Sequence, residues 1–289
     1  MVHPSLESIK TTREIEELWN WLGYLTSPQN VKDVLLEKIS QNRFRIVYDN
    51  ILRKGAVGFP LITEDAVEKN AESITKYVEQ SRDLFQAARD VSEIASPILY
   101  YFGMLSLAKA LILSTYDVSG KDNPFRRHGL HTKGETHDQV QVKRFGVFPS
   151  LHDCYSDEPE LYLEETEFSL KDLLSTNPEL GAEYRLTYKE DPRFRGDFKG
   201  DLDVELGKYT ILPINGRTLH LIDSIFVTTY VLCSKARYKP EHWIREITSG
   251  KGSFILRSFL MKAERRFPNL VLNEIMEKRF LFAPSARLG

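Results

Sequence analysis

The feature that most constrains the fold is a nearly uninterrupted apolar run, SPILYYFGMLSLAKALILSTY, at residues 96–116. Ser96 and Pro97 favour a helix start, because serine caps helices and proline fits the first turn. Gly103 and Ala108 allow a neighbouring helix to approach closely. We therefore expect a buried, aromatic-rich helix inside a mostly helical fold.

This run leads directly into a loop dense in arginine and histidine, KDNPFRRHGLHTKG at residues 121–134. The helix alone is typical of a protein core, and the loop alone is typical of a surface. Together they place cationic and titratable groups beside a rigid, buried helix. Such a junction favours a site that handles phosphate or RNA.

The remaining patterns predict a mainly α protein with a helical-bundle core and a small β-containing insertion, α+β overall. Thr63 is the expected N-cap of a long helix over 64–91, since acidic residues follow it in the first turn. The other expected helices cover 5–22, 30–42 and several segments after 217, and the expected strands cover 161–168, 182–188 and 208–214. We predict a helical N-terminal region at 1–140, an acidic β-containing insertion at 141–215, and a basic helical region at 216–289 that packs on the N-terminal helices.

Charge is distributed unevenly along the chain, although the net charge is only −2. Residues 151–207 hold sixteen Asp and Glu against six Lys and Arg, whereas residues 231–289 hold twelve Lys and Arg against five Asp and Glu. Two interpretations stay open: both segments are solvated faces, or the acidic segment docks on the basic one.

Cysteine usage and hydropathy predict a cytoplasmic protein with no membrane association. Cys154 and Cys233 form no CxxC pair, so neither a disulfide framework nor a zinc site follows. The N-terminus lacks the apolar core of a signal peptide, and no charge-free apolar run reaches the length of a membrane span.

A metal site is not expected, because the histidines and neighbouring aspartates that could serve as ligands fit no standard zinc spacing. These residues are His128, His131, His137, His152, Asp138 and Asp153. The glycines form neither a phosphate-binding loop nor a dinucleotide fingerprint, and no GxSxG, HExxH or kinase signature is present. We expect no cofactor.

Four blocks carry a resemblance to the YaaC-like family of bacterial proteins: the 96–113 run, HGL at 128–130, LCSKARYKPEHW at 232–243 and RRFPNLVLN at 265–273. The resemblance spans residues 90–275 and implies little chemistry, since the family is poorly characterised. The same helix followed by a His-Gly pair is similar to HEPN domains, helical bundles that include metal-independent RNases of toxin–antitoxin and anti-phage systems. That resemblance implies a HEPN-like bundle, a homodimer or partner protein, and an Arg-x4-6-His motif at a cleft.

Metal-independent RNA cleavage needs a base near the 2′-hydroxyl and a cation near the phosphate, roles that suit His and Arg. Two Arg-x4-His pairs are candidates for the catalytic residues: Arg237 with His242, and Arg126 with His131. Pro240 interrupts the first pair, and the second lies in a loop. The alternatives are a helix-capping arginine with an exposed histidine, and a solvated basic loop.

Cationic residues around these pairs are expected to contact nucleic acid: Arg127, His128, Lys133, Lys235 and Lys239. A second basic and aromatic segment, residues 191–200, is interpreted as a turn-rich hairpin loop.

Two functions therefore compete. The first is a non-catalytic helical interaction module of a bacterial defence or toxin-type system, which binds a partner protein or nucleic acid. The second is a HEPN-like metal-independent RNase that uses an Arg-x4-His pair. We favour the interaction module, because no highly specific catalytic signature is present.

Overall fold

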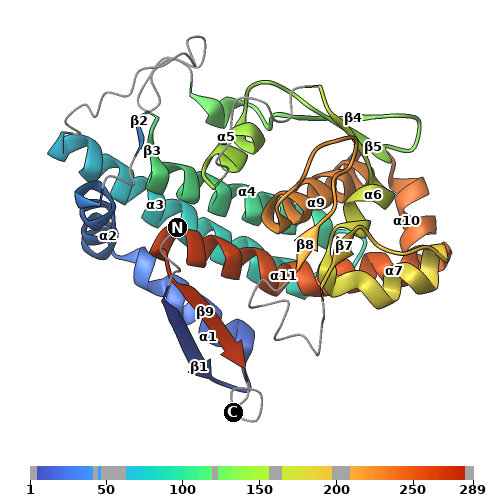
Figure 1. Ribbon diagram of the computed structural model, residues 1–289, viewed down its shortest axis with the longest axis horizontal. Coiled ribbons are helices and arrows are strands. Elements are labelled where there is room, and N and C mark those ends of the chain that lie inside the picture. The colour runs from blue at the N-terminus through green and yellow to red at the C-terminus, as the bar shows by residue number, and fades with distance from the viewer. Residues whose placement is uncertain are drawn as a thin grey trace.

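The apolar run forms a single helix, α4 (Ser96–Thr115), around which the other long helices pack (Figure 1). The computed structural model describes residues 5–41, 45–46, 63–118, 123–155, 165–196 and 209–283. Helices α3 (Glu64–Asp90), α9 (Leu221–Tyr238) and α11 (Ser253–Met276) contact α4, as does the short α5 (Val147–Asp153). The expectation of a mainly α fold with a small β part is confirmed.

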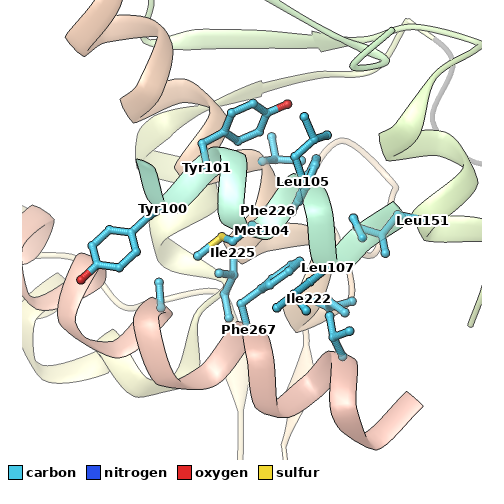
Figure 2. Packing of buried hydrophobic residues seen from close by; sticks show 14 of the residues in the cluster. Tyr100, Tyr101, Met104, Leu105, Leu107, Leu151, Ile222, Ile225, Phe226 and Phe267 are labelled. Atoms are coloured by element: carbon cyan, nitrogen blue, oxygen red, sulfur yellow. The ribbon is translucent and has the colours of Figure 1, made fainter. Parts of the chain in front are cut away.

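Burial of α4 explains why its sequence is apolar on every side. Figure 2 shows Met104 and Leu107 of α4 packed among Ile225 and Phe226 of α9 and Phe267 of α11. Within the described residues, α4 is the helix long and apolar enough to cross a membrane by length and composition, and most of it is buried inside the protein.

Helices α3 and α4 approach each other closely at Gly103, as the sequence predicts. A side-chain carbon at Gly103 would lie 2.6 Å from the ring of Phe85 on α3. The Ser81 hydroxyl donates to the Gly103 carbonyl over 2.9 Å at the same crossing. Thr63 caps α3 by accepting from the Ala66 amide, which confirms the expected helix start.

The N-terminal elements differ from the single helix expected over 5–22. The strand β1 (Leu6–Lys10) comes first and pairs in parallel with β9 (Arg279–Ala283) near the other end of the chain. Three helical elements follow: α1 (Glu14–Gly23), the 3-10 turn η1 (Tyr24–Thr26) and α2 (Pro28–Ser40). Two further strands, β2 (Arg45–Ile46) and β3 (Tyr116–Asp117), also pair in parallel.

The middle of the chain holds most of the β structure. A 3-10 turn, η2 (Pro124–Arg126), leads into the antiparallel sheet of β4 (Leu130–Lys133), β5 (Gln139–Val142) and β6 (Glu167–Ser169). Next come α6 (Leu170–Ser175), the 3-10 turn η4 (Pro178–Leu180), α7 (Gly181–Tyr188), β7 (Phe194–Arg195) and β8 (Thr210–Ile211). The sheet extends across the predicted boundary at residue 140, and the three-part division of the chain stays a prediction.

The strand predicted over 182–188 is wrong, since these residues lie in α7. The alternation of polar and apolar residues suggested a strand, but Tyr184 and Thr187, one helical turn apart, are the buried positions. Leu186, which the alternation would bury, is 62% exposed. The strand predicted over 161–168 is found in part, as β6, and residues 161–164 lie outside the described residues.

Part of the acidic segment docks on the basic C-terminal region, which supports the second interpretation of the charge pattern. Lys262 on α11 binds Glu183 on α7 over 2.7 Å, and Arg265 binds Glu179 on η4 over 2.9 Å. The remaining helix, α10 (Pro240–Ser249), begins two residues after α9 ends, and Trp243 anchors it by donating to the Ile94 carbonyl over 2.9 Å.

Candidate functional site

Three of the sequence blocks meet where the C-terminal half of α9 crosses α4. The hydroxyl of Tyr101 on α4 lies 2.7 Å from Nδ1 of His128, which precedes β4. The Tyr230 ring of α9 packs against both, with ring centroids 5.3 Å from Tyr101 and 5.8 Å from His128. Figure 2 shows Tyr100 and Tyr101 leaving α4 in different directions, so only one of the two tyrosines reaches this junction.

Backbone contacts with α5 fix the position of His128. The first amides of a helix have no partner within the helix. Here Phe148 donates to the His128 carbonyl, and Val147 donates to the preceding carbonyl, each over 2.9 Å. Gly129 and Gly146 touch at this point: a side-chain carbon on Gly146 would lie 2.3 Å from the Gly129 nitrogen. Gly129, the glycine of the His-Gly pair, therefore allows its backbone to approach that of Gly146 closely.

The surroundings of His128 are cationic and half-buried. Burial lowers the pKa of its imidazole, and the charges of Arg237 and Lys109 lower that pKa further. His128 is therefore neutral near pH 7. The charge of Arg237, near the end of α9, therefore acts on His128 although the two residues are far apart in the sequence.

Arg237 is exposed and stacks on aromatic rings. Its guanidinium carbon lies 5.8 Å from the ring centroid of Phe102 and 4.9 Å from that of Tyr238. In the part of the chain that the structure describes, no carboxylate lies within ion-pair distance of this guanidinium. An exposed arginine with no described counter-charge is available to an anionic ligand.

Lys109 contributes a second cation from α4. Its ammonium lies 5.3 Å from the ring centroid of Tyr77 and 5.6 Å from that of Phe125. Burial lowers its pKa. We refer to Arg237, His128, Lys109, Tyr101 and Phe102 as the Arg237–His128 surface.

Cys233 lies below this surface on α9. Burial raises the pKa of its thiol to about 11, and the nearby Arg237 only partly offsets that effect. A thiol in this state is protonated near pH 7 and is a poor nucleophile.

A second group of cations lies beside the first, around His137. Burial lowers the pKa of His137, and the charges of Lys239, Lys235 and His131 lower it further. Its Nδ1 lies 2.9 Å from the hydroxyl of Ser234 on α9, which ties the loop between β4 and β5 to the helix.

Among the described residues, no hydrogen bond joins the two members of either predicted Arg-x4-His pair, and the pairing stays a prediction. His242 lies on α10 with Nε2 3.9 Å from Glu246, and Pro240 starts a new helix between it and Arg237. Arg126 ends η2 and His131 lies on β4, both with exposed side chains. The charge of Arg237, from the first predicted pair, lowers the pKa of His128, which lies in the loop of the second pair.

Some of the residues predicted to contact nucleic acid are accessible, and others are paired with carboxylates of the protein. Arg127 is exposed, and Lys239 is half-buried beside His137. Lys133 is paired with Glu167. Lys235 is fully buried between Asp138 and Glu246, the latter at 2.8 Å, so it fixes α9 to its neighbours and is not placed to meet a ligand.

Sequence reasoning missed a buried cluster at the opposite end of α9. Nδ1 of His152 lies 2.8 Å from Oδ2 of Asp223, and the Tyr155 hydroxyl donates to the other carboxylate oxygen. Burial alone would lower the pKa of His152 and raise that of Asp223. Their mutual attraction outweighs burial, so the pKa of His152 is raised and that of Asp223 is lowered. The two residues are 71 positions apart, and no spacing rule relates them.

No arrangement of three or more His, Cys, Asp and Glu suited to a metal ion occurs among the residues described by the structure. Comparison with known proteins gives a match to the family model described as YaaC-like Protein, over residues 24–204 and 202–275. No curated protein and no solved structure matches the chain.

Proposed function

The chain belongs to the YaaC-like family, and we propose that it is an interaction module that binds nucleic acid through the Arg237–His128 surface. The observation that carries this proposal is the exposed guanidinium of Arg237 beside His128 and Lys109, with no carboxylate in the described residues to neutralise it. The planar fork of arginine can bind two oxygens of one phosphate at once, as it does with a carboxylate. The link to defence or toxin control, like the resemblance to HEPN domains, stays a prediction.

The binding proposal has the Tyr101 hydroxyl donate its hydrogen bond to Nδ1 of His128. Burial holds the pKa of Tyr101 well above its usual value, so the hydroxyl stays protonated and has a proton to donate. In that tautomer Nε2 carries the ring proton and can donate to a phosphate oxygen. Neutral His128 is then a hydrogen-bond donor, and Arg237 supplies the charge.

The test is the affinity for a fluorescently labelled oligoribonucleotide, measured by anisotropy over a series of salt concentrations. Arg237→Gln is expected to weaken binding about tenfold, about 1.4 kcal/mol, and to reduce the slope of log affinity against log salt by about 0.7. Arg245→Gln is the matched control, because Arg245 is an exposed arginine on α10. Equal affinities for the wild type and both variants would refute the proposed surface.

RNA cleavage is the second candidate, and the depressed pKa of His128 favours it. In the other neutral tautomer, Nδ1–H donates to the Tyr101 oxygen and Nε2 has a lone pair. Nε2 would then take the proton of a 2′-hydroxyl while that oxygen attacks phosphorus, and Arg237 would hold the phosphate. The products are a 2′,3′-cyclic phosphate and a 5′-hydroxyl. Water gives a proton to the leaving oxygen, and the hydroxide that forms takes the proton back from Nε2, which restores the neutral imidazole.

Two measurements separate the candidates. Nitrogen chemical shifts of His128 report which ring nitrogen carries the proton. Incubation with labelled RNA shows whether cyclic-phosphate ends appear and whether His128→Gln removes them. A proton on Nε2 together with intact RNA supports the binding module, whereas a proton on Nδ1 with cyclic-phosphate ends supports the nuclease.

A further inference from the structure

An exposed tyrosine lies between the two groups of cations. Tyr238 is the last residue of α9, and it is 59% exposed. Its ring centroid lies 4.9 Å from the guanidinium carbon of Arg237 and 6.2 Å from the ring centroid of His137. It therefore joins the Arg237–His128 surface to the second cationic group.

The second group keeps a positive charge beside this ring. Lys235 contributes little to that charge, since Asp138 and Glu246 neutralise it. Lys239 follows Tyr238 directly and lies near His137. Among the described residues, no carboxylate is within ion-pair distance of Lys239. The sequence Arg237-Tyr238-Lys239 thus presents an exposed ring with the guanidinium of Arg237 over it and a lysine at the next position in the chain.

An exposed ring flanked by cations matches the chemistry of single-stranded nucleic acid. Each base of a single strand has a π-face free to stack on an aromatic side chain, and the phosphates on either side carry charge. In a duplex the base faces are already stacked on one another, so an aromatic ring finds no free face. An acidic peptide would meet the cations but would gain nothing from the ring.

We propose that Tyr238 is a base-stacking platform, and that the strip from Lys109 through Arg237 and Tyr238 to Lys239 binds single-stranded in preference to duplex nucleic acid. A base stacks on the Tyr238 ring while neighbouring phosphates contact Arg237 and Lys239. This inference rests on the proposed function, since it specifies the ligand of the same surface.

The test compares three labelled probes: a single-stranded oligoribonucleotide, a duplex of the same sequence, and an abasic strand with the same number of phosphates. The single strand is expected to bind the wild type most tightly. Tyr238→Ala should weaken binding of the base-bearing strand about 5- to 150-fold, the usual range for the loss of one stacked base, and should leave binding of the abasic strand unchanged. Tyr238→Phe keeps the ring and should bind as the wild type does.

Tyr24→Ala is the matched control, because Tyr24 is also exposed but lies in η1. Circular dichroism of both alanine variants checks that the fold is retained. Equal affinities for single strand and duplex, with no effect of Tyr238→Ala, would overturn the inference while an effect of Arg237→Gln would preserve the proposed function. Binding of poly-glutamate but of none of the three nucleic-acid probes would overturn both.

Discussion

The two ends of α9 each hold a histidine of another segment, in opposite electrostatic surroundings. At the N-terminal end, His152 is buried against Asp223, and its pKa is raised. At the C-terminal end, His128 is half-buried beside Arg237, and its pKa is lowered. Negative charge near a helix N-terminus and positive charge near its C-terminus both suit the helix dipole. One helix thus supports a neutralised pair inside the fold and an unneutralised group at its surface.

This difference separates residues that hold the fold from residues available to a ligand. The pair at the N-terminal end satisfies its charges internally, so disrupting it should affect stability. Arg237 and Lys239 at the C-terminal end have no counter-charge among the described residues, so removing them should affect binding. Variants at the two ends should therefore have different consequences.

Asp223→Asn is expected to have the largest effect on stability. Removal of one partner leaves His152 buried without its counter-charge, which costs about 3–5 kcal/mol. Urea denaturation measures the loss. Asp191→Asn is the control, since Asp191 forms an exposed pair with Arg185 and should cost less than about 1 kcal/mol. If Asp223→Asn lost no more stability than Asp191→Asn, the His152–Asp223 pair would not hold the fold, and the contrast between the two ends of α9 would be wrong.

Gly146→Ala should affect both quantities that the comparison separates. It should lower the stability of the fold, and it should weaken RNA binding because it disturbs the placement of His128. Gly146 has φ 143 and ψ −173, a conformation almost confined to glycine. The strain costs about 1–3 kcal/mol, and contact with the Gly129 backbone adds to it. The free energy of unfolding, measured by urea denaturation, and the RNA affinity should both decrease. Gly134→Ala, at φ 82 with open space around it, should cost about 1 kcal/mol and spare binding.

Tyr101→Phe tests the surface end of α9 with a smaller change. It removes the hydroxyl that contacts His128 and keeps the ring. The loss of one hydrogen bond costs about 1 kcal/mol, and RNA affinity should fall because the imidazole is no longer oriented. The exposed Tyr24→Phe should change neither quantity. Unchanged RNA affinity in Tyr101→Phe would show that Tyr101 does not position His128.

The change of stability with pH that each histidine causes should be the smallest of these effects. It compares the two ends of α9 most directly, because the two pKa values shift in opposite directions. His152 has a raised pKa, so it stabilises the fold fully below about pH 6.5 and loses that contribution as pH rises through the raised value. Asp223 contributes above its usual pKa of 3.8 and loses its contribution as pH falls further. His128 has a lowered pKa, so it contributes above about pH 6.5 and loses that contribution as pH falls.

Histidine proton shifts measured by NMR check these directions. The titration midpoint of His128 should lie below 6.5 and that of His152 above it. His128→Gln and His152→Gln assign the two signals. Midpoints in the reverse order would contradict the electrostatic contrast between the ends of α9.

Local signals in the sequence predicted the local structure well. The apolar run gave α4, the Thr63 cap gave the start of α3, and Pro240 separated α9 from α10. The strand expected over 182–188 was wrong because so short a segment fits both the helical and the strand periodicity. Packing against the rest of the fold determines which of its residues are buried, and here it favours the helix α7.

The sequence identified members of the candidate site but not their partners. Arg237 was predicted to pair with His242, and His128 was predicted to contact nucleic acid beside the Arg126–His131 pair. Tertiary packing of α9 against α4 brings these two residues together, and no spacing rule contains that information. The His152–Asp223 pair was missed for the same reason.

The parallel pairing of β1 with β9 joins Leu6 to Arg279, across nearly the whole chain. A ribosome that adds about 5–20 residues per second leaves β1 without its partner strand for on the order of tens of seconds. The central helices can pack during this interval, while the edge of β1 stays open to other chains. During synthesis, β1 is thus a strand that a chaperone would have reason to shield.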